Sequence, residues 1–258
     1  MELLHSVASS ASIAFENAQL YHDLKQEVSR EKEIRFVFQK YVPEEVIDEI
    51  LVKKESEIFR GEAKQISVLN MDLRGFSQMA QVSEPEAVVE ILNFFFSMMG
   101  DIVFRYKGTI DKYLGDGMMA LFGAIVTSPY DALRAVLAAL EMRDAMGRVS
   151  EYAEKKCKVP LAMGIAINFG DAILGNIGFE KKMEYTAIGE VINTVFRIEG
   201  LNHGHPNTIL ISRELCDRVQ RYIEVDDWGI FKINDGKQEI QVFEVLKRNS
   251  SNLPNIGI

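Results

Sequence analysis

Apolar and polar positions repeat with two different periods along the chain, and the period changes from one segment to the next. Residues 66–72 form a mostly apolar, β-branched run, which predicts a strand covered on both faces. Residues 88–106 place apolar side chains three or four positions apart, so they predict a long amphipathic helix. A capping box at residues 83–86 predicts where this helix begins, and Gly108 predicts where it ends.

Similar patterns predict the elements that follow. Residues 109–122 fit a hairpin that turns at 115–117, and a second long helix begins at Ser128 and Pro129. The remaining predicted elements are strands at 161–168 and 172–177, a helix at 190–201, a strand at 208–211, a short helix from Ser212, and a hairpin of 222–233 with 239–246. This order predicts an α+β fold in which helices cover one side of a sheet.

The first 51 residues are nearly free of Gly and Pro, which predicts a helix. A seam spaced by four and three positions indicates a coiled coil, and it comprises Ile13, Asn17, Leu20, Leu24, Glu27, Glu31, Ile34, Phe38 and Tyr41. A shifted seam through Ala14, Ala18, Tyr21 and Val28 competes with it, and a solvated helix that lies on its own domain is the alternative. We expect a coiled-coil linker at 1–41, a short helix and linker at 42–60, a folded domain at 61–247 and a tail at 248–258.

Composition limits the classes of function that this chain can have. The net charge of −9 argues against nonspecific nucleic-acid binding, because phosphate backbones attract basic surfaces. A length of 258 residues with 47% hydrophobic content suffices for a packed core. No apolar run approaches the ~20 residues that cross a bilayer, and the N-terminus lacks a signal-peptide layout, so we expect no membrane segment and a cytoplasmic location.

Two isolated carboxylates stand at the ends of apolar runs. Residues 68–77 read VLNMDLRGFS and contain Asp72, whereas residues 112–123 read KYLGDGMMALFG and contain Asp116. Carboxylates are rarely buried without a partner, so these two suggest a shared cation. The alternative is a pair of turn aspartates that never meet, because Asp beside Gly is ordinary turn chemistry.

A third segment completes a recognisable pattern. Residues 175–178 read GNIG, and residues 184–197 read EYTAIGEVINTVFR. Together the three segments resemble class III nucleotidyl cyclases over roughly 59–246. The resemblance implies a ferredoxin-like βαββαβ catalytic domain that converts ATP to 3′,5′-cyclic AMP and pyrophosphate. Residues 13–21 also resemble the closing helix of GAF sensor domains, which implies an upstream sensor domain in the full-length protein.

The resemblance assigns the residues near the phosphates. It implies two divalent ions, Mg²⁺ or Mn²⁺, held by Asp72, Leu73 and Asp116. The segment expected to bind the triphosphate, in part through backbone N–H groups made accessible by Gly75, comprises Leu73, Arg74, Gly75, Phe76 and Ser77. A simple turn without a phosphate contact is the alternative for this segment.

The resemblance also assigns the residues near the base and the ribose. Lys112 and Thr186 match the base-reading positions, and Lys with Thr resembles the adenylate-specific members. A lysine only donates, whereas a threonine hydroxyl donates or accepts. Asn193 and Arg197 share one helix face and match the residues that orient the ribose and stabilise the α-phosphoryl charge. A surface ion pair of Arg197 with a neighbouring glutamate, Glu190 or Glu199, is the alternative.

The sequence departs from the family pattern in places. Glu190 stands where Asp is common, and the last hairpin reads NDGK at 234–237, where many members carry a phosphate-binding Lys-Gly. Lys237 is therefore the expected phosphate ligand there, with Lys232 as its alternative. The resemblance implies a homodimer in which one chain gives the metal ligands and its partner gives the base, ribose and transition-state residues. The rival interpretations are a guanylate cyclase, against which Lys112 argues, and a non-catalytic dimerisation or nucleotide-sensing domain.

Overall fold

A computed structural model describes residues 15–30, 32, 61–179, 182–233, 238–249 and 254–256 of the chain. The chain divides into two units, Met1–Lys54 and Glu55–Ile258. In the first unit, residues 15–30 form a helix whose side chains are exposed, with Phe15 at 70% and Tyr21 at 71%. The helical prediction holds for these residues. Much of the predicted seam, from Ile34 onward, lies outside the described residues, so the coiled coil stays a prediction.

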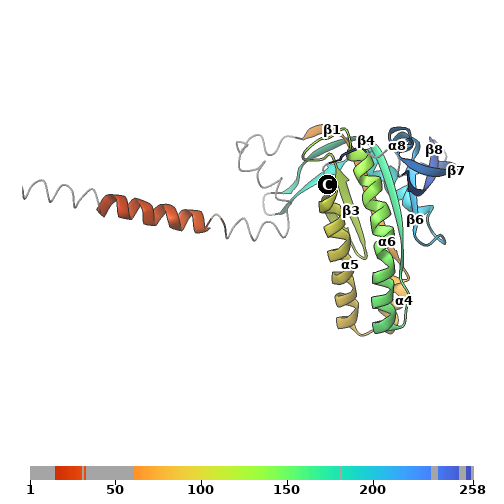
Figure 1. The fold of residues 1–258 in the computed structure, drawn as a ribbon, viewed down its shortest axis with the longest axis horizontal. Helices are drawn as coiled ribbons and strands as arrows, with labels where there is room; N and C mark the ends of the chain where they lie inside the picture. The colour runs from red at the N-terminus through yellow and green to blue at the C-terminus, as the bar shows by residue number, and fades with distance from the viewer. Residues whose placement is uncertain are drawn as a thin grey trace, which may run out of the picture. The chain divides into compact units, whose positions relative to one another are not determined.

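The second unit is built on one mixed sheet of eight strands among its described residues, in the order β2–β3–β1–β4–β6–β8–β7, with β5 paired to β4 (Figure 1). The strands are β1 (Glu62–Arg74), β2 (Thr109–Leu114), β3 (Gly117–Phe122), β4 (Ala162–Phe179), β5 (Lys182–Ile188), β6 (Thr208–Ser212), β7 (Ile223–Ile233) and β8 (Gln238–Arg248). The helices are α4 (Phe76–Val82), α5 (Pro85–Arg105), α6 (Asp131–Cys157), α7 (Glu190–Gly200) and α8 (Arg213–Val219).

The first four strands and the two long helices follow the order β1-α5-β2-β3-α6-β4. Their sheet order is β2–β3–β1–β4, and each neighbouring pair is antiparallel. This is the ferredoxin-like arrangement, so the predicted α+β, ferredoxin-like fold is confirmed. The strands β6, β7 and β8 extend the sheet beyond β4.

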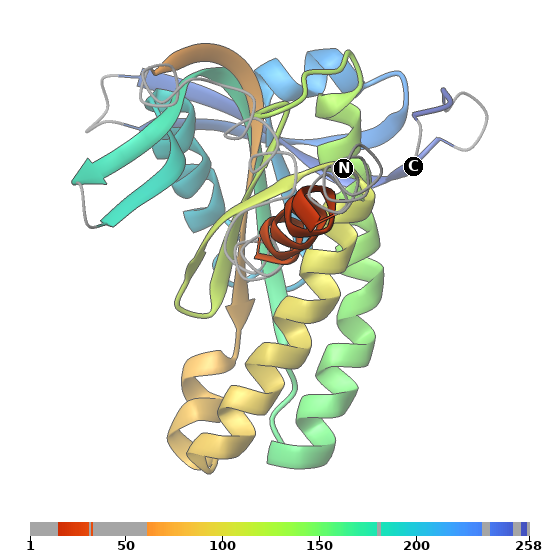
Figure 2. The ribbon, with the colours of Figure 1, turned by 90° about the vertical axis from the view of Figure 1, so that its left-hand side faces the viewer.

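Different helices cover the two faces of the sheet. Leu69 of β1 belongs to a core shared with α5, α6 and α8, whereas its neighbour Val68 belongs to a second core with Val195 of α7. Figure 2 shows α5 and α6 side by side on the near face of the sheet. The expectation of helices on one side is therefore wrong, because α7 carries an apolar stripe that packs on the opposite face.

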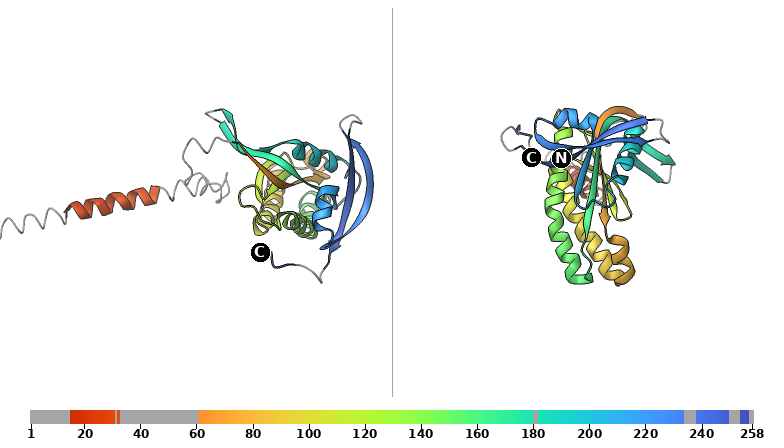
Figure 3. Two further views of the ribbon diagram at one scale, coloured as in Figure 1. Left: turned by 90° about the horizontal axis from the view of Figure 1, so that it is seen from above. Right: turned by 90° about the vertical axis from the view of Figure 1, so that its right-hand side faces the viewer.

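Two strands differ from the sequence prediction. β4 is one strand of 18 residues, not two strands around Gly170. Gly170 lies against α7, where an added Cβ would come within 3.3 Å of Val191 Cβ, so this glycine marks a close packing contact and not a break. β5 was not predicted, and it pairs with the second half of β4, with Gly175 opposite Thr186. The β4–β5 extension projects from the domain on the side away from β7 and β8 (Figure 3, left).

The N-cap of helix α5 lies one residue later than predicted. Glu84 is the N-cap and Pro85 the first helical residue, while the Ser83 side chain makes no capping hydrogen bond, so the predicted capping box is wrong. Among the described helices, α5 alone is long and apolar enough to cross a membrane by length and composition. Its buried side chains, including Phe95 and Met99, pack in the core with α6.

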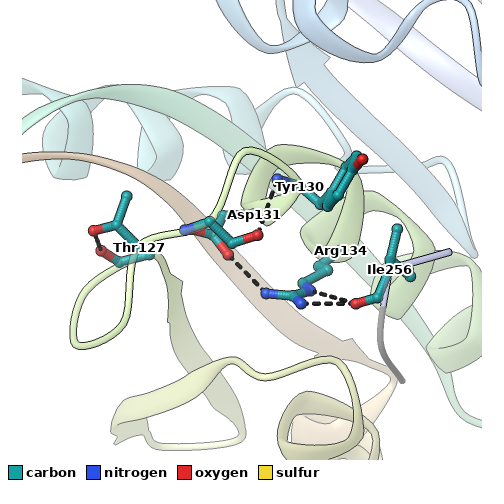
Figure 4. Close-up of polar contacts among 7 residues, drawn as sticks. Thr127, Tyr130, Asp131, Arg134 and Ile256 are labelled. Atoms are coloured by element: carbon teal, nitrogen blue, oxygen red, sulfur yellow. Dashed lines mark hydrogen bonds and ion pairs between the residues drawn. The ribbon is translucent and has the colours of Figure 1, made fainter. Parts of the chain in front are cut away.

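The described part of the C-terminal segment packs against the core. The Ile256 carbonyl accepts hydrogen bonds from Arg134 Nε at 3.3 Å and Arg134 Nη2 at 2.7 Å. Arg134 Nη1 also donates to Asp131 Oδ1 at 3.2 Å (Figure 4). Asp131 Oδ2 accepts from the Ser128 N–H at 2.6 Å, so the start of α6 anchors the returning chain.

Candidate active site

Asp72 and Asp116 lie close together, where the end of β1 meets the turn between β2 and β3. The pairing of β1 with β3 sets Met71 opposite Met118, which brings Asp72 beside the turn. A Cβ added at Gly117 would lie 2.6 Å from the Met71 carbonyl oxygen and 3.4 Å from Asp72 Oδ1. Only glycine permits this approach without a backbone shift. The two carboxylates are therefore neighbours, and not separate turn residues.

The two carboxylates carry more negative charge than their surroundings neutralise. Burial is the largest cause that raises the pKa of both Asp72 and Asp116, and the nearby Asp72 charge raises the pKa of Asp116 further. Arg74 lowers both pKa values, and its Nη1 donates to Asp72 Oδ2 at 2.7 Å. Oxygen ligands with excess negative charge are what Mg²⁺ and Mn²⁺ prefer, so the donor set fits a divalent ion.

Arg74 connects strand β1 to helix α7. Its guanidinium pairs with Asp72 and with Glu199, and the three side chains are largely buried, Arg74 being 18% and Glu199 12% exposed. Glu199 follows Arg197 by two residues on α7. The Arg74 side chain is thus engaged within the chain, which leaves its backbone as the part able to meet a triphosphate.

The segment that follows Asp72 turns sharply into α4. Leu73 is 3% exposed, so only its main chain can face the site. Gly75 has φ 89°, in the left-handed region, and an added Cβ would lie 3.0 Å from the Pro160 carbonyl oxygen. Phe76 packs against the core and begins α4, while Ser77 is exposed. N–H groups in the first turn of a helix have no partner within that helix, so this turn can donate to an anion.

Lys112 and Thr186 meet at a third residue, Asp111. Thr186 Oγ1 donates to Asp111 Oδ2 at 3.0 Å, and Lys112 Nζ lies 3.4 Å from the same oxygen. Lys112 Nζ also lies 3.6 Å from Glu184 Oε2. The Asp111 side chain has no exposed surface, whereas that of Lys112 is 32% exposed. The structure therefore brings the two expected base-reading residues together.

Sequence reasoning missed Asp111. A charged residue beside a lysine in a hairpin strand is usually a solvated one, and nothing in its spacing shows burial. The strand pairing shows its special position, because Ile110 pairs with Ala120 and Lys112 with Met119, which leaves Asp111 as an extra residue. Such bulges re-aim side chains and occur often beside active sites.

Asn193 and Arg197 share one face of α7, as predicted, and both contact Glu190. Arg197 Nη1 donates to Glu190 Oε1 at 2.7 Å, and Asn193 Nδ2 donates to Glu190 Oε2 at 3.2 Å. The alternative ion pair of Arg197 with Glu190 is thus present in the single chain. This contact is exposed, and exposed ion pairs contribute little free energy, so a ligand can replace it.

The structure describes only one of the two candidate phosphate-binding lysines in the last hairpin. Lys237 lies outside the described residues, whereas Lys232 is exposed near the end of β7. The described part of the chain contains no group of three or more His, Cys, Asp or Glu side chains that could hold a metal ion. A metal at Asp72 and Asp116 would thus need backbone, nucleotide or water oxygens to complete its shell.

Comparison with known proteins assigns this arrangement to a class. The profile of the family described as "Adenylate and Guanylate cyclase catalytic domain" matches residues 59–247. The chain belongs to this family, the class III nucleotidyl cyclases.

Several relatives and solved structures are similar to this chain. An adenylate cyclase of Anabaena cylindrica is 30% identical over 81% of the chain and 42% of that relative. Adenylate cyclase 1 of Rhizobium meliloti is 25% identical over 85% of the chain and 33% of that relative. The chain thus spans less than half the length of these relatives.

The structures agree in fold. The guanylyl cyclase Cya2 is 33% identical with a TM-score of 0.69, covering 74% of this chain and 96% of its own. The adenylyl cyclase CyaB from P. aeruginosa is 29% identical with a TM-score of 0.71, covering 75% of this chain and 100% of its own.

Proposed function

We propose that this chain is an adenylate cyclase that converts ATP to 3′,5′-cyclic AMP and pyrophosphate. The observation that carries the proposal is the contact of Thr186 and Lys112 with one buried carboxylate, Asp111. Adenine offers an acceptor at N1 and a donor at N6. The Lys112 ammonium can donate to N1, and the Thr186 oxygen can accept from N6. Guanine would present N1–H to Lys112, so a donor would meet a donor.

The reaction would proceed at the carboxylate pair. Asp72 and Asp116, with the Leu73 backbone, would hold two divalent ions, Mg²⁺ or Mn²⁺. Such ions lower the pKa of the attacking 3′-hydroxyl and neutralise phosphate charge. Arg74 holds Asp72 in position, and the first turn of α4 offers N–H donors to the triphosphate.

Helix α7 would act on the reacting atoms from the other side. Arg197 presents a planar, permanently charged fork that suits the charge developing on the α-phosphoryl oxygens. Asn193, one turn earlier, would orient the ribose so that its 3′-oxygen is in line with the leaving pyrophosphate. Lys237 or Lys232 would add a phosphate contact from the last hairpin.

Exposed apolar side chains support a homodimer with shared sites. They lie on β2, the β4–β5 extension and α7, the elements that carry the base and ribose residues, and they are Tyr113, Leu114, Ile173, Ile177, Phe179, Met183, Ile188 and Phe196. Exposed apolar side chains that gather on a few elements of a folded domain favour a protein partner. A two-fold dimer would place the metal residues of one chain beside the base-reading residues of the other.

The larger protein would be a signalling enzyme. The relatives are more than twice as long as the matched segment, which supports an upstream sensor domain joined through the N-terminal helix. An ATP-consuming catalytic domain of this kind would work in the cytoplasm.

The test is a direct assay of product. Purified protein with ATP or GTP, and with Mg²⁺ or Mn²⁺, should form cyclic AMP at a higher kcat/KM than cyclic GMP. Formation of neither product by a folded, dimeric sample would favour a non-catalytic domain.

Guanylate cyclase activity is the second candidate. The similarity to the guanylyl cyclase Cya2, at 33% identity, favours it. A higher kcat/KM for GTP in the same assay would establish this alternative and would reject the proposed reading of adenine by Lys112.

A further inference from the structure

Hydrogen-bond donors meet at one oxygen of the buried Asp111 side chain, Oδ2, whereas its Oδ1 is buried without a hydrogen-bond partner among the described residues. The Thr186 hydroxyl donates to its Oδ2 at 3.0 Å, and the Lys112 ammonium lies 3.4 Å from that oxygen. A backbone hydrogen bond from Ala187 also stabilises the carboxylate. These donors differ in one property: an ammonium and a backbone N–H can only donate, whereas a hydroxyl can either donate or accept.

We propose that Asp111 fixes the hydrogen-bond polarity of Thr186 and is thereby a positioning residue for base selection. A carboxylate only accepts, so the Thr186 hydrogen points at Asp111 and the Thr186 oxygen is left with acceptor capacity alone. This inference rests on the proposed adenylate cyclase function and deepens it. A threonine hydroxyl can donate or accept, and Asp111 would explain why that of Thr186 prefers adenine to guanine.

The consequence for the base follows from its edge. Adenine carries an amino group at position 6, which donates to the Thr186 oxygen. Guanine carries a carbonyl at position 6, so two acceptors would face each other. Leaving a buried acceptor unpaired costs more than the net value of one hydrogen bond, and this asymmetry favours ATP.

The local structure is built to hold Asp111 in this place. The extra residue in β2 directs Asp111 inward, and the β4–β5 pairing sets Thr186 opposite Gly175. Burial is the largest cause of the raised pKa of Asp111, and the hydrogen bonds of Thr186, Lys112 and Ala187 oppose it. A carboxylate in such a place is costly unless several donors contact it, so the arrangement is specific and not incidental.

The substitution Asp111→Asn separates polarity from shape. The variant keeps the size of the side chain but replaces one oxygen with an amide NH2 group. An NH2 group in the place of Oδ1 would be buried without an acceptor, whereas one in the place of Oδ2 faces the Thr186 oxygen, which can accept. Lys112 and the Ala187 N–H cannot reverse their direction, whereas the Thr186 hydroxyl can. It would then accept from the Asn amide and turn its hydrogen toward the base, where it suits the guanine carbonyl.

The experiment measures kcat/KM for ATP and for GTP in the full chain. The wild-type protein should prefer ATP, which tests the proposed function first and separately. Asp111→Asn should lower the ATP-over-GTP ratio about tenfold, the value of roughly one hydrogen bond. ITP, which has the 6-carbonyl but lacks the 2-amino group of GTP, should gain relative to ATP in the same way.

Controls distinguish polarity from general damage. Thr186→Val removes the hydroxyl, so adding Asp111→Asn to it should not change the ratio further. Equal loss for ATP and GTP in Asp111→Asn, or the same ratio change with and without the Thr186 hydroxyl, would overturn the inference. If Asp111→Asn does not fold by circular dichroism, Asp111→Ser answers the question: it frees the hydroxyl to turn either way and should lower the ratio. An unchanged ratio there would overturn the inference equally.

Discussion

The β2–β3 hairpin carries two aspartates, Asp111 within β2 and Asp116 at the turn, and their electrostatic surroundings differ. Asp116 lies at the turn beside Asp72, where a second negative charge raises its pKa beyond the effect of burial. Asp111 is completely buried in the strand, where Thr186, Lys112 and Ala187 all lower its pKa against the effect of burial. Arg74 only partly offsets the causes that raise the pKa of Asp116, whereas Asp111 Oδ2 is contacted by donors from its own chain.

This difference indicates what each aspartate does. For Asp72 and Asp116 the causes that raise the pKa outweigh those that lower it, including Arg74, so we expect the pair to gain stability when a divalent ion binds. A carboxylate whose donors come from its own chain instead determines how those donors are oriented. We call the region of Asp72 and Asp116 the metal end and the region of Asp111, Lys112 and Thr186 the base end. The metal end should control turnover, and the base end should control which nucleotide is used.

The largest expected effect is at the metal end. Asp72→Asn and Asp116→Asn should each lower kcat on the order of a hundredfold or more, because charge stabilisation in the transition state is lost. Both nucleotides should be affected alike. Asp101→Asn, on the exposed face of α5, is the matched control and should leave kcat unchanged. Substantial activity in both site variants, with an intact circular dichroism spectrum, would contradict the metal assignment.

A smaller effect is expected at the base end. Lys112→Glu should lower kcat/KM for ATP about tenfold, because a carboxylate would face the adenine N1 lone pair, and should shift preference toward GTP. Lys107→Glu, an exposed charge reversal just before β2, is the control and should leave the nucleotide ratio unchanged. Unchanged ATP kinetics in Lys112→Glu would show that Lys112 does not touch the base.

Mixing two inactive variants of this chain tests whether the metal end of one subunit and helix α7 of its partner form one site. Asp72→Asn and Arg197→Ala should each be nearly inactive alone. In a re-associated equal mixture, half the dimers would be mixed and each would hold one intact site, so roughly a quarter of wild-type activity should return. If mass spectrometry shows subunit exchange and no activity returns, the shared-site proposal fails.

The smallest effect concerns stability and pH. The folded-state pKa of Asp116 is raised above its ordinary value of 3.8, so the ionised carboxylate destabilises the fold as pH rises through that raised pKa. Without divalent ions, Asp116→Asn should unfold at a slightly higher temperature than wild type near neutral pH, and the gap should close toward about pH 4. Adding Mg²⁺ should raise the melting temperature of wild type more than that of the variant. A variant less stable at every pH would contradict this.

Sequence patterns predicted the parts of the fold that depend on local periodicity. The apolar series of α5, the Gly-Asp-Gly turn and the seryl cap of α8, where Ser212 accepts from the Leu215 N–H, all follow from neighbouring residues. The patterns failed where a distant contact decides the structure. Gly170 continues a strand because α7 packs on it, and β5 exists because β4 offers it an edge.

The same limit applies to the site. Resemblance to a family located Asp72, Asp116, Lys112 and Thr186, and the fold brought each pair together. Burial of Asp111 depends on a bulge that no spacing reveals. The ion pair of Arg74 with Glu199 joins residues far apart in sequence, so it too was visible only in three dimensions.

Gly117 has a consequence for mutational scanning of this cyclase-family domain. It has no side chain with which to bind a ligand, yet any larger residue would press on the Met71 carbonyl oxygen, which lies 2.6 Å from the place of a Cβ. Every substitution there should push the hairpin away from β1 and separate the two carboxylates. In a library selected for cyclic nucleotide output, Gly117 should therefore be as intolerant as the ligands themselves, although its contribution is only the absence of a methyl group.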